Sequence, residues 1–210
     1  MNQYKVTSGV KLIGIHGHAG AGKDTVADYL CESYYHTYAE SFASPLKDAA
    51  ASAFGVSRHM FDTQDGKATV LPFWNVSPRQ IAQFMGTEMF RETLAKLMPD
   101  IGSDFWVKRM AGLLSNSLPD SQAVYNSEDV VVIPDVRFQN EYDFIVENNG
   151  IIIHLTRPGA DGNIGIPGHA SESSLNLHDQ ERTFPCVNDS DFTTLFDRID
   201  SITLNTNIYS

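Results

Sequence analysis

The stretch "VKLIGIHGHAGAGKDTVADYL", residues 10–30, passes from an apolar run through a glycine-rich turn into an amphipathic pattern. Residues 17–23 fit the pattern GxxxxGK and stand between a predicted strand and a predicted helix, as a phosphate-binding loop requires. Glycines let backbone N–H groups point into one concavity, the helix start adds partial positive charge, and Lys23 adds a mobile full charge. The alternative to a phosphate-binding loop is a glycine-rich turn between strand and helix with a solvated lysine. The GxxxxGK spacing and its position between strand and helix disfavour this alternative. The pattern predicts a polyphosphate site made by His18, Ala19, Gly20, Ala21, Gly22 and Lys23.

The residue after Lys23 departs from the usual motif. Where Ser or Thr normally serves magnesium, this chain has Asp24 and then Thr25. A carboxylate in the first helical turn interacts well with the helix dipole. It also faces incoming phosphates, so magnesium, water or a hydrogen bond to the acceptor must offset the repulsion. This order of residues resembles the small-metabolite and nucleotide kinases rather than the GTPases, which indicates transfer to a second small molecule.

Apolar runs alternate with helical patterns along the rest of the chain. Candidate strands cover residues 10–15, 130–135 and 151–156, with short ones at 38–43 and 184–187. Short, nearly continuous apolar strands between helices are typical of a parallel sheet covered on both faces. The predicted fold class is therefore α/β. With no repeat or linker, residues 1–210 are expected to form one domain, with a helical region at about 44–118.

Two long polar stretches, residues 55–76 and 158–182, show no clear periodicity and are interpreted as loops. The second carries glycine at every third position from 159 to 168. Such a segment can close over a substrate as a lid that excludes water, and a plain surface loop is the alternative. Helix starts are better marked, because Ser44-Pro45 and Ser77-Pro78 each combine a capping hydroxyl with proline.

Charged residues follow two of the apolar strands. Asp135 and Arg137 come at the end of the run 130–135, and Arg157 follows the run 151–156. Ligands of open α/β sheets bind beyond the carboxyl ends of the strands. Asp135 would lie near magnesium or the acceptor, or would cap the following helix. Arginine donors match the oxygens of a phosphoryl group in transfer, with surface placement as the alternative.

The helical region carries candidate acceptor-binding groups. Lys47 and Arg79 fall in the first turns of their predicted helices, where they could join the helix N-termini in binding a monophosphate. Trp106 sits among apolar residues, so it is either a core side chain or a base-stacking one. Gln83, Gly86 and Thr87 could contact a base or sugar through amide, backbone and hydroxyl groups. Close packing between helices explains Gly86 equally well.

The composition limits the cellular compartment and the kinds of partner that can be expected for this protein. Fifteen basic and 26 acidic residues give a formal charge of −11, which argues against a broad binding surface for polynucleotide or anionic membrane. The two cysteines form no CxxC pair or zinc cluster, and the N-terminal sequence lacks the regions of a signal peptide. No apolar run reaches the ~20 residues of a membrane span. We expect a cytoplasmic protein that binds small molecules, and homodimerisation is left open.

Taken together, these residues resemble the bacteriophage deoxynucleoside monophosphate kinases. The matching pieces are, in order, "GKDTVADYL", "PLKDA", "RQIAQFMGTE", "FWVKRM", "IPDVRFQNEYD", "IIHLTRPG", "HASE" and "VNDSDFTTLFDRI". They cover nearly the whole chain except residues 55–76, so base specificity is left open.

The resemblance implies a three-layer P-loop nucleoside monophosphate kinase fold and transfer of the γ-phosphoryl of ATP, with Mg²⁺, to a deoxynucleoside monophosphate. Catalytic roles fall by resemblance on Lys23, Asp24, Arg137 and Arg157. Thr25 and Asn188 join the residues implied to bind ATP, and Asn188 and Asp189 fall where such kinases hold adenine. Asp135 or Thr25 is implied to meet magnesium directly or through water. Acceptor binding is implied for Asp24, Lys47, Arg79, Gln83, Gly86, Thr87, Trp106, Asp135, Arg137, Glu141 and Glu172, with His169 in the lid.

Two other functions remain as alternatives. A kinase of another metabolite, such as dephospho-coenzyme A, shares similar phosphate loops but would not predict "RQIAQFMGTE" together with "PDVRFQNE". An ATP-hydrolysing switch has no acceptor, so it would not need the several cationic groups beyond those that ATP requires.

Overall fold

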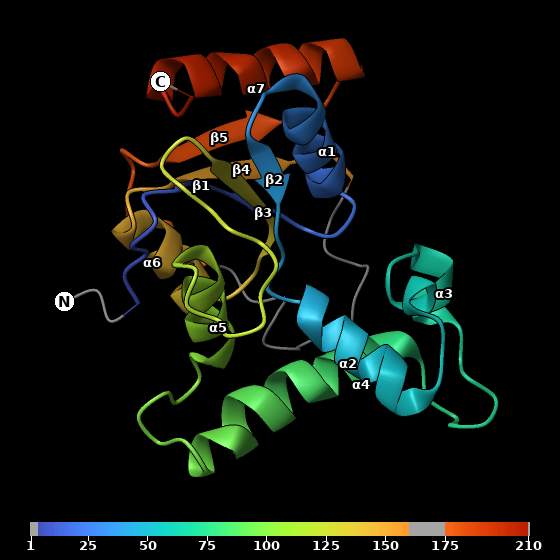
Figure 1. Ribbon diagram of the computed structural model, residues 1–210. Helices are drawn as coiled ribbons and strands as arrows, with labels where there is room; N and C mark the ends of the chain where they lie inside the picture. Colours follow the sequence, from blue (N-terminus) through green and yellow to red (C-terminus); the bar gives the residue numbers. More distant parts are fainter. Residues whose placement is uncertain (1–3, 160–174, 210) are drawn as a thin grey trace. The chain divides into compact units, whose positions relative to one another are not determined.

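The computed structural model describes residues 4–159 and 175–209 (Figure 1). Contacts within the chain define two compact units, one made of Met1–Ser41 with Arg109–Ser210 and the other of Phe42–Lys108. The larger unit carries the sheet, and the smaller unit is helical. That the two act as a single kinase domain stays a prediction.

The larger unit is built on a five-stranded sheet. Its strands are β1 (Lys11–His16), β2 (Thr37–Ala39), β3 (Val130–Val136), β4 (Ile151–Thr156) and β5 (Thr183–Val187). They run parallel in the order β2-β3-β1-β4-β5. The α/β class is confirmed. β3 and β4 lie on either side of β1, so Arg137 and Arg157 follow strands that flank the phosphate loop.

Helices cover both faces of this sheet, which confirms the three-layer fold (Figure 1). Alternate side chains of a strand point to opposite faces. Ile13 and Ile15 pack in one cluster with buried residues of α1 (Lys23–Ser33) and α7 (Phe192–Thr206). Between them, Gly14 faces α6 (Gln139–Glu147), where an added Cβ would lie 2.6 Å from Ile145 Cδ1. The glycine thus allows α6 to approach β1 closely.

The smaller unit consists of short helices. They are α2 (Ser44–Phe54), η1 (Arg58–Phe61), α3 (Gln64–Ala68), α4 (Pro78–Phe84), the π-helical η2 (Met85–Thr93) and η3 (Leu94–Lys96). The next helix, α5 (Phe105–Leu114), begins in this unit and ends in the larger one. Ser77 caps α4 as predicted, because its Oγ accepts from the Gln80 backbone N at 3.3 Å. Its own backbone N donates to Gln80 Oε1 at 2.9 Å.

Two local expectations for this unit were wrong. Ser44 does not cap α2: it is the first residue of the helix, the capping position is held by Ala43, and Ser44 Oγ instead accepts from Arg58 Nη2 at 3.3 Å. Residues 55–76 are not an irregular loop, because they hold η1 and α3. Helices of four and five residues are too short to show a period in the sequence.

Within the described ranges, the helices lack the length and apolar character needed to cross a membrane.

Candidate active site

The glycine-rich loop between β1 and α1 forms a backbone cradle. Gly20 and Gly22 take positive φ values of 81° and 100°, in the left-handed region that favours glycine. A Cβ on Gly17 would lie 2.2 Å from the backbone O of Leu155, so the loop passes directly against β4. The loop therefore depends on glycine both for its turns and for its contact with the sheet.

Lys23 reaches back across this loop. Its Nζ donates to the carbonyl O of Gly17 at 2.7 Å and to that of His18 at 2.9 Å. The ammonium group thus lies beside the loop backbone at the start of α1. Asp24 is exposed in the first helical turn, and Thr25 follows it. A full positive charge, glycine-shaped backbone and a helix N-terminus are the components of a polyphosphate site.

The ends of β4 and β5 hold two predicted residues against the same loop. Arg157 Nη1 donates to the Gly20 carbonyl O at 3.5 Å, at the long end of hydrogen-bond distances. Asn188 Nδ2 donates to the Ala21 carbonyl O at 2.9 Å, and the Asn188 backbone N donates to Thr156 O at 2.7 Å. Neither residue is near the loop in the sequence, and the strand order brings them there.

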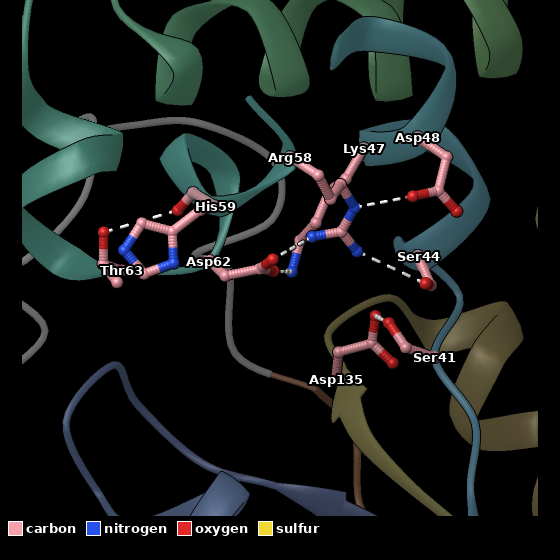
Figure 2. Close-up of polar contacts among 9 residues, drawn as sticks. All are labelled: Ser41, Ser44, Lys47, Asp48, Arg58, His59, Asp62, Thr63 and Asp135. Atoms are coloured by element: carbon pink, nitrogen blue, oxygen red, sulfur yellow. Dashed lines mark hydrogen bonds and ion pairs between the residues drawn. The ribbon is translucent and has the colours of Figure 1, made fainter. Parts of the chain in front are cut away.

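The end of β3 carries a second polar group of residues. Asp135 Oδ2 accepts from Ser41 Oγ at 2.7 Å, a contact drawn in Figure 2. The buried Glu141 places one oxygen, Oε2, 2.8 Å from the backbone N of Arg137 and 3.0 Å from that of Phe138. Glu141 therefore fixes the backbone at the start of α6 and leaves the exposed Arg137 at the strand end. The roles of Glu141 and Arg137 toward a substrate stay predictions.

His16 joins the ends of β1 and β3. Its Nδ1 lies 3.0 Å from the carbonyl O of Val136, between Asp135 and Arg137 in the sequence. A carbonyl only accepts, so Nδ1 carries the proton and donates. The sequence carries no local signal for His16 or Ser41, because their partners lie 120 and 94 residues away.

Side-chain oxygens at this edge of the sheet are of the kind that magnesium binds. Among the described residues, no three His, Cys, Asp or Glu side chains are grouped to hold a metal ion by themselves. Magnesium prefers oxygen ligands and is usually held by one or two carboxylates together with substrate phosphates and waters. Asp135 and Thr25 offer such oxygens, so the residues present fit this ion.

Predicted acceptor residues of the helical unit already have partners within it. Lys47 Nζ lies 3.2 Å from Asp62 Oδ1, and Arg79 Nη2 donates to Gln64 Oε1 at 3.2 Å. Gln83 Oε1 is buried without a hydrogen-bond partner among the described residues. A buried acceptor left unpaired is costly, so this atom is suited to a donor from a ligand or water.

Trp106 and Gly86 serve the packing of the helical unit. The Trp106 side chain is buried, its Nε1 donates to the Gly86 carbonyl O at 3.2 Å, and its ring centroid lies 4.8 Å from that of Phe90. A Cβ on Gly86 would lie 3.0 Å from Leu46 Cδ2, so this glycine allows close packing on α2. The core alternative accounts for these contacts, and substrate roles for Trp106, Gly86 and Thr87 stay predictions.

Some predicted positions lie outside the described residues. His169 and Glu172 fall within residues 160–174, as does most of the predicted lid at 158–182. Asp189 is described, and it pairs with Arg198 Nη1 at 2.7 Å.

The lowered pKa values of two histidines, His16 and His154, indicate that the free energy of unfolding decreases at mildly acidic pH. The His16 and His154 ring centroids are 5.3 Å apart. Burial lowers the pKa of both, and the charges of His18 and, for His16, also His154 and Lys23 lower it further. For His16 the hydrogen bond to Val136 opposes the shift. Their unfolded pKa is about 6.5, so below that pH the unfolded chain binds more protons than the folded one.

Stability is therefore expected to decrease as the pH falls from 7.5 through 6.5 toward the lower folded pKa values. Urea unfolding at pH 7.5 and 5.5 measures the change. The double variant His16→Asn/His154→Gln removes both titrating groups and should show a smaller difference between the two pH values. If the stability difference between pH 7.5 and 5.5 were the same in the variant as in the wild type, other titrating groups would be its cause.

Comparison with known proteins gives the same family that the sequence motifs suggested. No family model matches the chain. A protein of Acanthamoeba polyphaga mimivirus, provisionally named a deoxynucleotide monophosphate kinase, is 34% identical over 170 residues, which are 80% of this chain and 85% of that protein. The deoxynucleotide monophosphate kinase of Enterobacteria phage T4 is 24% identical over 90% of this chain and 97% of its own. The deoxynucleoside-5'-monophosphate kinase of Escherichia phage T5 is 24% identical over 66% of this chain and 72% of its own length. Because the mimivirus relative exceeds 30% identity over most of its length, the chain belongs to the deoxynucleotide monophosphate kinase family.

Proposed function

We propose that this protein transfers the γ-phosphoryl group of ATP to a deoxynucleoside monophosphate, giving ADP and a deoxynucleoside diphosphate. The observation that carries the proposal is the glycine cradle with the Lys23 ammonium across it. The names of the three relatives support a monophosphate acceptor over dephospho-coenzyme A. They also oppose a switch, which has no acceptor.

On the donor side, the loop from His18 to Lys23, with Thr25, would bind the β- and γ-phosphates of ATP. Asn188 supports this role, because its Nδ2 donates to Ala21 O and so ties the end of β5 to the loop. By resemblance, Asn188 and Asp189 would also lie beside adenine. Magnesium would be held by Asp135 or Thr25, directly or through water. When bound, it neutralises charge on the phosphate oxygens.

In the transfer step, an oxygen of the acceptor monophosphate bonds to the γ-phosphorus of ATP. The bond from that phosphorus to the β–γ bridging oxygen breaks, and its electrons leave with ADP. Arg137 and Arg157 would donate to the equatorial oxygens, where charge is spread during transfer. Asp24 would face the acceptor. The other residues proposed to bind the acceptor are Lys47, Arg79, Gln83, Gly86, Thr87, Trp106, Asp135, Glu141 and Glu172.

The proposed setting is a reducing cytoplasm. The described cysteines, Cys31 and Cys186, are free thiols, which suits such a compartment. Small nucleotides would be the partners of the protein there.

Arg137→Lys tests the proposed role of the planar guanidinium. Lysine keeps the charge but donates from a single point, so kcat should fall by roughly 10- to 100-fold. The fold should be kept, because Arg137 is exposed and the hydrogen bond from its backbone N to Glu141 does not depend on the side chain. Steady-state kinetics measures the loss, with Arg182→Lys as the matched control. Wild-type kcat in Arg137→Lys would assign this arginine to the surface.

An equilibrium experiment separates the kinase from the switch. With a non-hydrolysable ATP analogue at saturation, each common nucleoside monophosphate is titrated by calorimetry. A kinase must bind both substrates together, so at least one deoxynucleoside monophosphate should saturate a single site. If none binds beside the analogue, the proposed transfer has no acceptor site and the switch is favoured.

A further inference from the structure

The helical unit contains a charged cluster, formed by Ser44, Lys47, Asp48, Arg58 and Asp62, whose contacts Figure 2 shows. Arg58 lies at its centre. Its Nε donates to Asp48 Oδ1 at 2.7 Å, its Nη1 donates to Asp62 Oδ2, and its Nη2 donates to Ser44 Oγ. The cluster lies in a stretch where family resemblance assigned nothing beyond Lys47.

Asp62 holds the two cations of the cluster through different oxygens. Oδ1 lies 3.2 Å from Lys47 Nζ, while Oδ2 accepts from Arg58. Burial alone would raise the pKa of Asp62, but hydrogen bonds from Arg58 and Lys47 outweigh it and lower the pKa. The carboxylate is therefore ionised at neutral pH, and it brings two positive charges to one small anionic group.

The side chains of the two cations are less exposed than those of the carboxylates that neutralise them. Side-chain exposure is 24% for Lys47 and 31% for Arg58, against 45% for Asp62 and 66% for Asp48. Exposed ion pairs contribute only about 0–1 kcal/mol each. An incoming anion can therefore replace the Asp62 carboxylate at little cost, while the cations stay in place on α2 and η1.

We propose that Lys47 and Arg58 form the binding site for the phosphate group of the acceptor, and that Asp62 occupies it until the phosphate displaces it. The proposal rests on the proposed function, since it takes the acceptor to be a nucleoside monophosphate. A phosphate monoester carries a charge near −2 at pH 7 and has three acceptor oxygens. It can thus bind both cations with more charge than the single carboxylate it replaces.

The geometry around Arg58 favours phosphate in particular. Guanidinium offers a planar fork that binds phosphate oxygens in pairs, and Lys47 adds a point charge. Both stand near the first turn of α2, whose N-terminus carries partial positive charge. A nucleoside without a phosphate could not displace Asp62. The exchange therefore selects phosphorylated acceptors, and Arg58 and Asp62 determine that selectivity.

Variants with opposite expected effects test the exchange. Arg58→Gln removes one of the two cations and should raise the KM for the monophosphate by about tenfold or more. Asp62→Asn removes the competing charge and should lower that KM several-fold. Neither should change the KM for ATP by more than about twofold. Asp65→Asn is the control for Asp62→Asn, because it removes an exposed carboxylate from the same segment and should change neither constant.

A gain of affinity in Asp62→Asn cannot come from damaged folding, so it distinguishes exchange from a purely structural ion pair. A higher acceptor KM in Asp62→Asn, or an unchanged acceptor KM in Arg58→Gln, would overturn the proposal. Calorimetry with the non-hydrolysable ATP analogue bound measures binding of the monophosphate without any phosphoryl transfer. If the monophosphate binds in this way but no product forms, the proposed function fails and the phosphate site stands. If product forms but Arg58→Gln changes nothing, the site fails and the function stands.

Discussion

Lys23→Ala is expected to lower kcat by about two to four powers of ten while the protein stays folded. The Lys23 ammonium lies against the carbonyls of Gly17 and His18, where it would meet the phosphates of the donor. Removal of a charge that stabilises the transferring group typically costs 10²-fold or more in rate. The side chain is not part of the buried core of the sheet. Its loss should therefore change the free energy of unfolding by less than about 1 kcal/mol.

Steady-state kinetics and urea unfolding on the same preparations measure both effects. Lys108→Ala is the control, because it removes an exposed lysine from α5. If Lys23→Ala kept wild-type turnover, the cradle would not be the donor site.

Gly17→Ala should damage both stability and activity. The new Cβ would lie 2.2 Å from the backbone O of Leu155, and this atom belongs to a fully buried residue of β4. Backbone in the middle of a sheet cannot move aside as a flexible side chain would. Overpacking of this kind costs typically about 1–3 kcal/mol, and the displaced loop would also lose its shape for phosphate.

Gly112→Ala is the matched control for this substitution. There the nearest atom to the added Cβ is the flexible Leu118 Cδ2 at 3.1 Å, and alanine favours the helix. Thermal and urea unfolding compare the two variants. Equal stability of Gly17→Ala and the wild type would mean that the loop does not pass so close to β4.

The donor half of the candidate site was predictable because its signals are local. The loop of residues 17–23 carries the GxxxxGK spacing within seven residues, and β3 and β4 are continuous apolar runs. The order of the strands was not predictable in this way. It depends on contacts between distant segments, so the positions of Arg157 and Asn188 against Gly20 and Ala21 emerged only from the fold.

The helical unit was harder to predict for physical reasons. Its helices η1 and α3 are shorter than two turns, so they leave no amphipathic period. Arg58 therefore stood in an apparently irregular stretch, and its partner Asp48 lies on a different helix. Ser44 looked like a helix cap, but the helix begins one residue earlier than that role requires, and the hydroxyl bonds to Arg58 instead.

Transfer to a deoxynucleoside monophosphate is tested by ADP production from ATP and magnesium, with each common ribo- and deoxyribonucleoside monophosphate supplied in turn. Chromatography identifies the second product. We expect ADP formation that depends on particular deoxynucleoside monophosphates, together with an equal amount of the matching diphosphate. ADP formed at the same rate without any acceptor, or no product with any monophosphate, would contradict it.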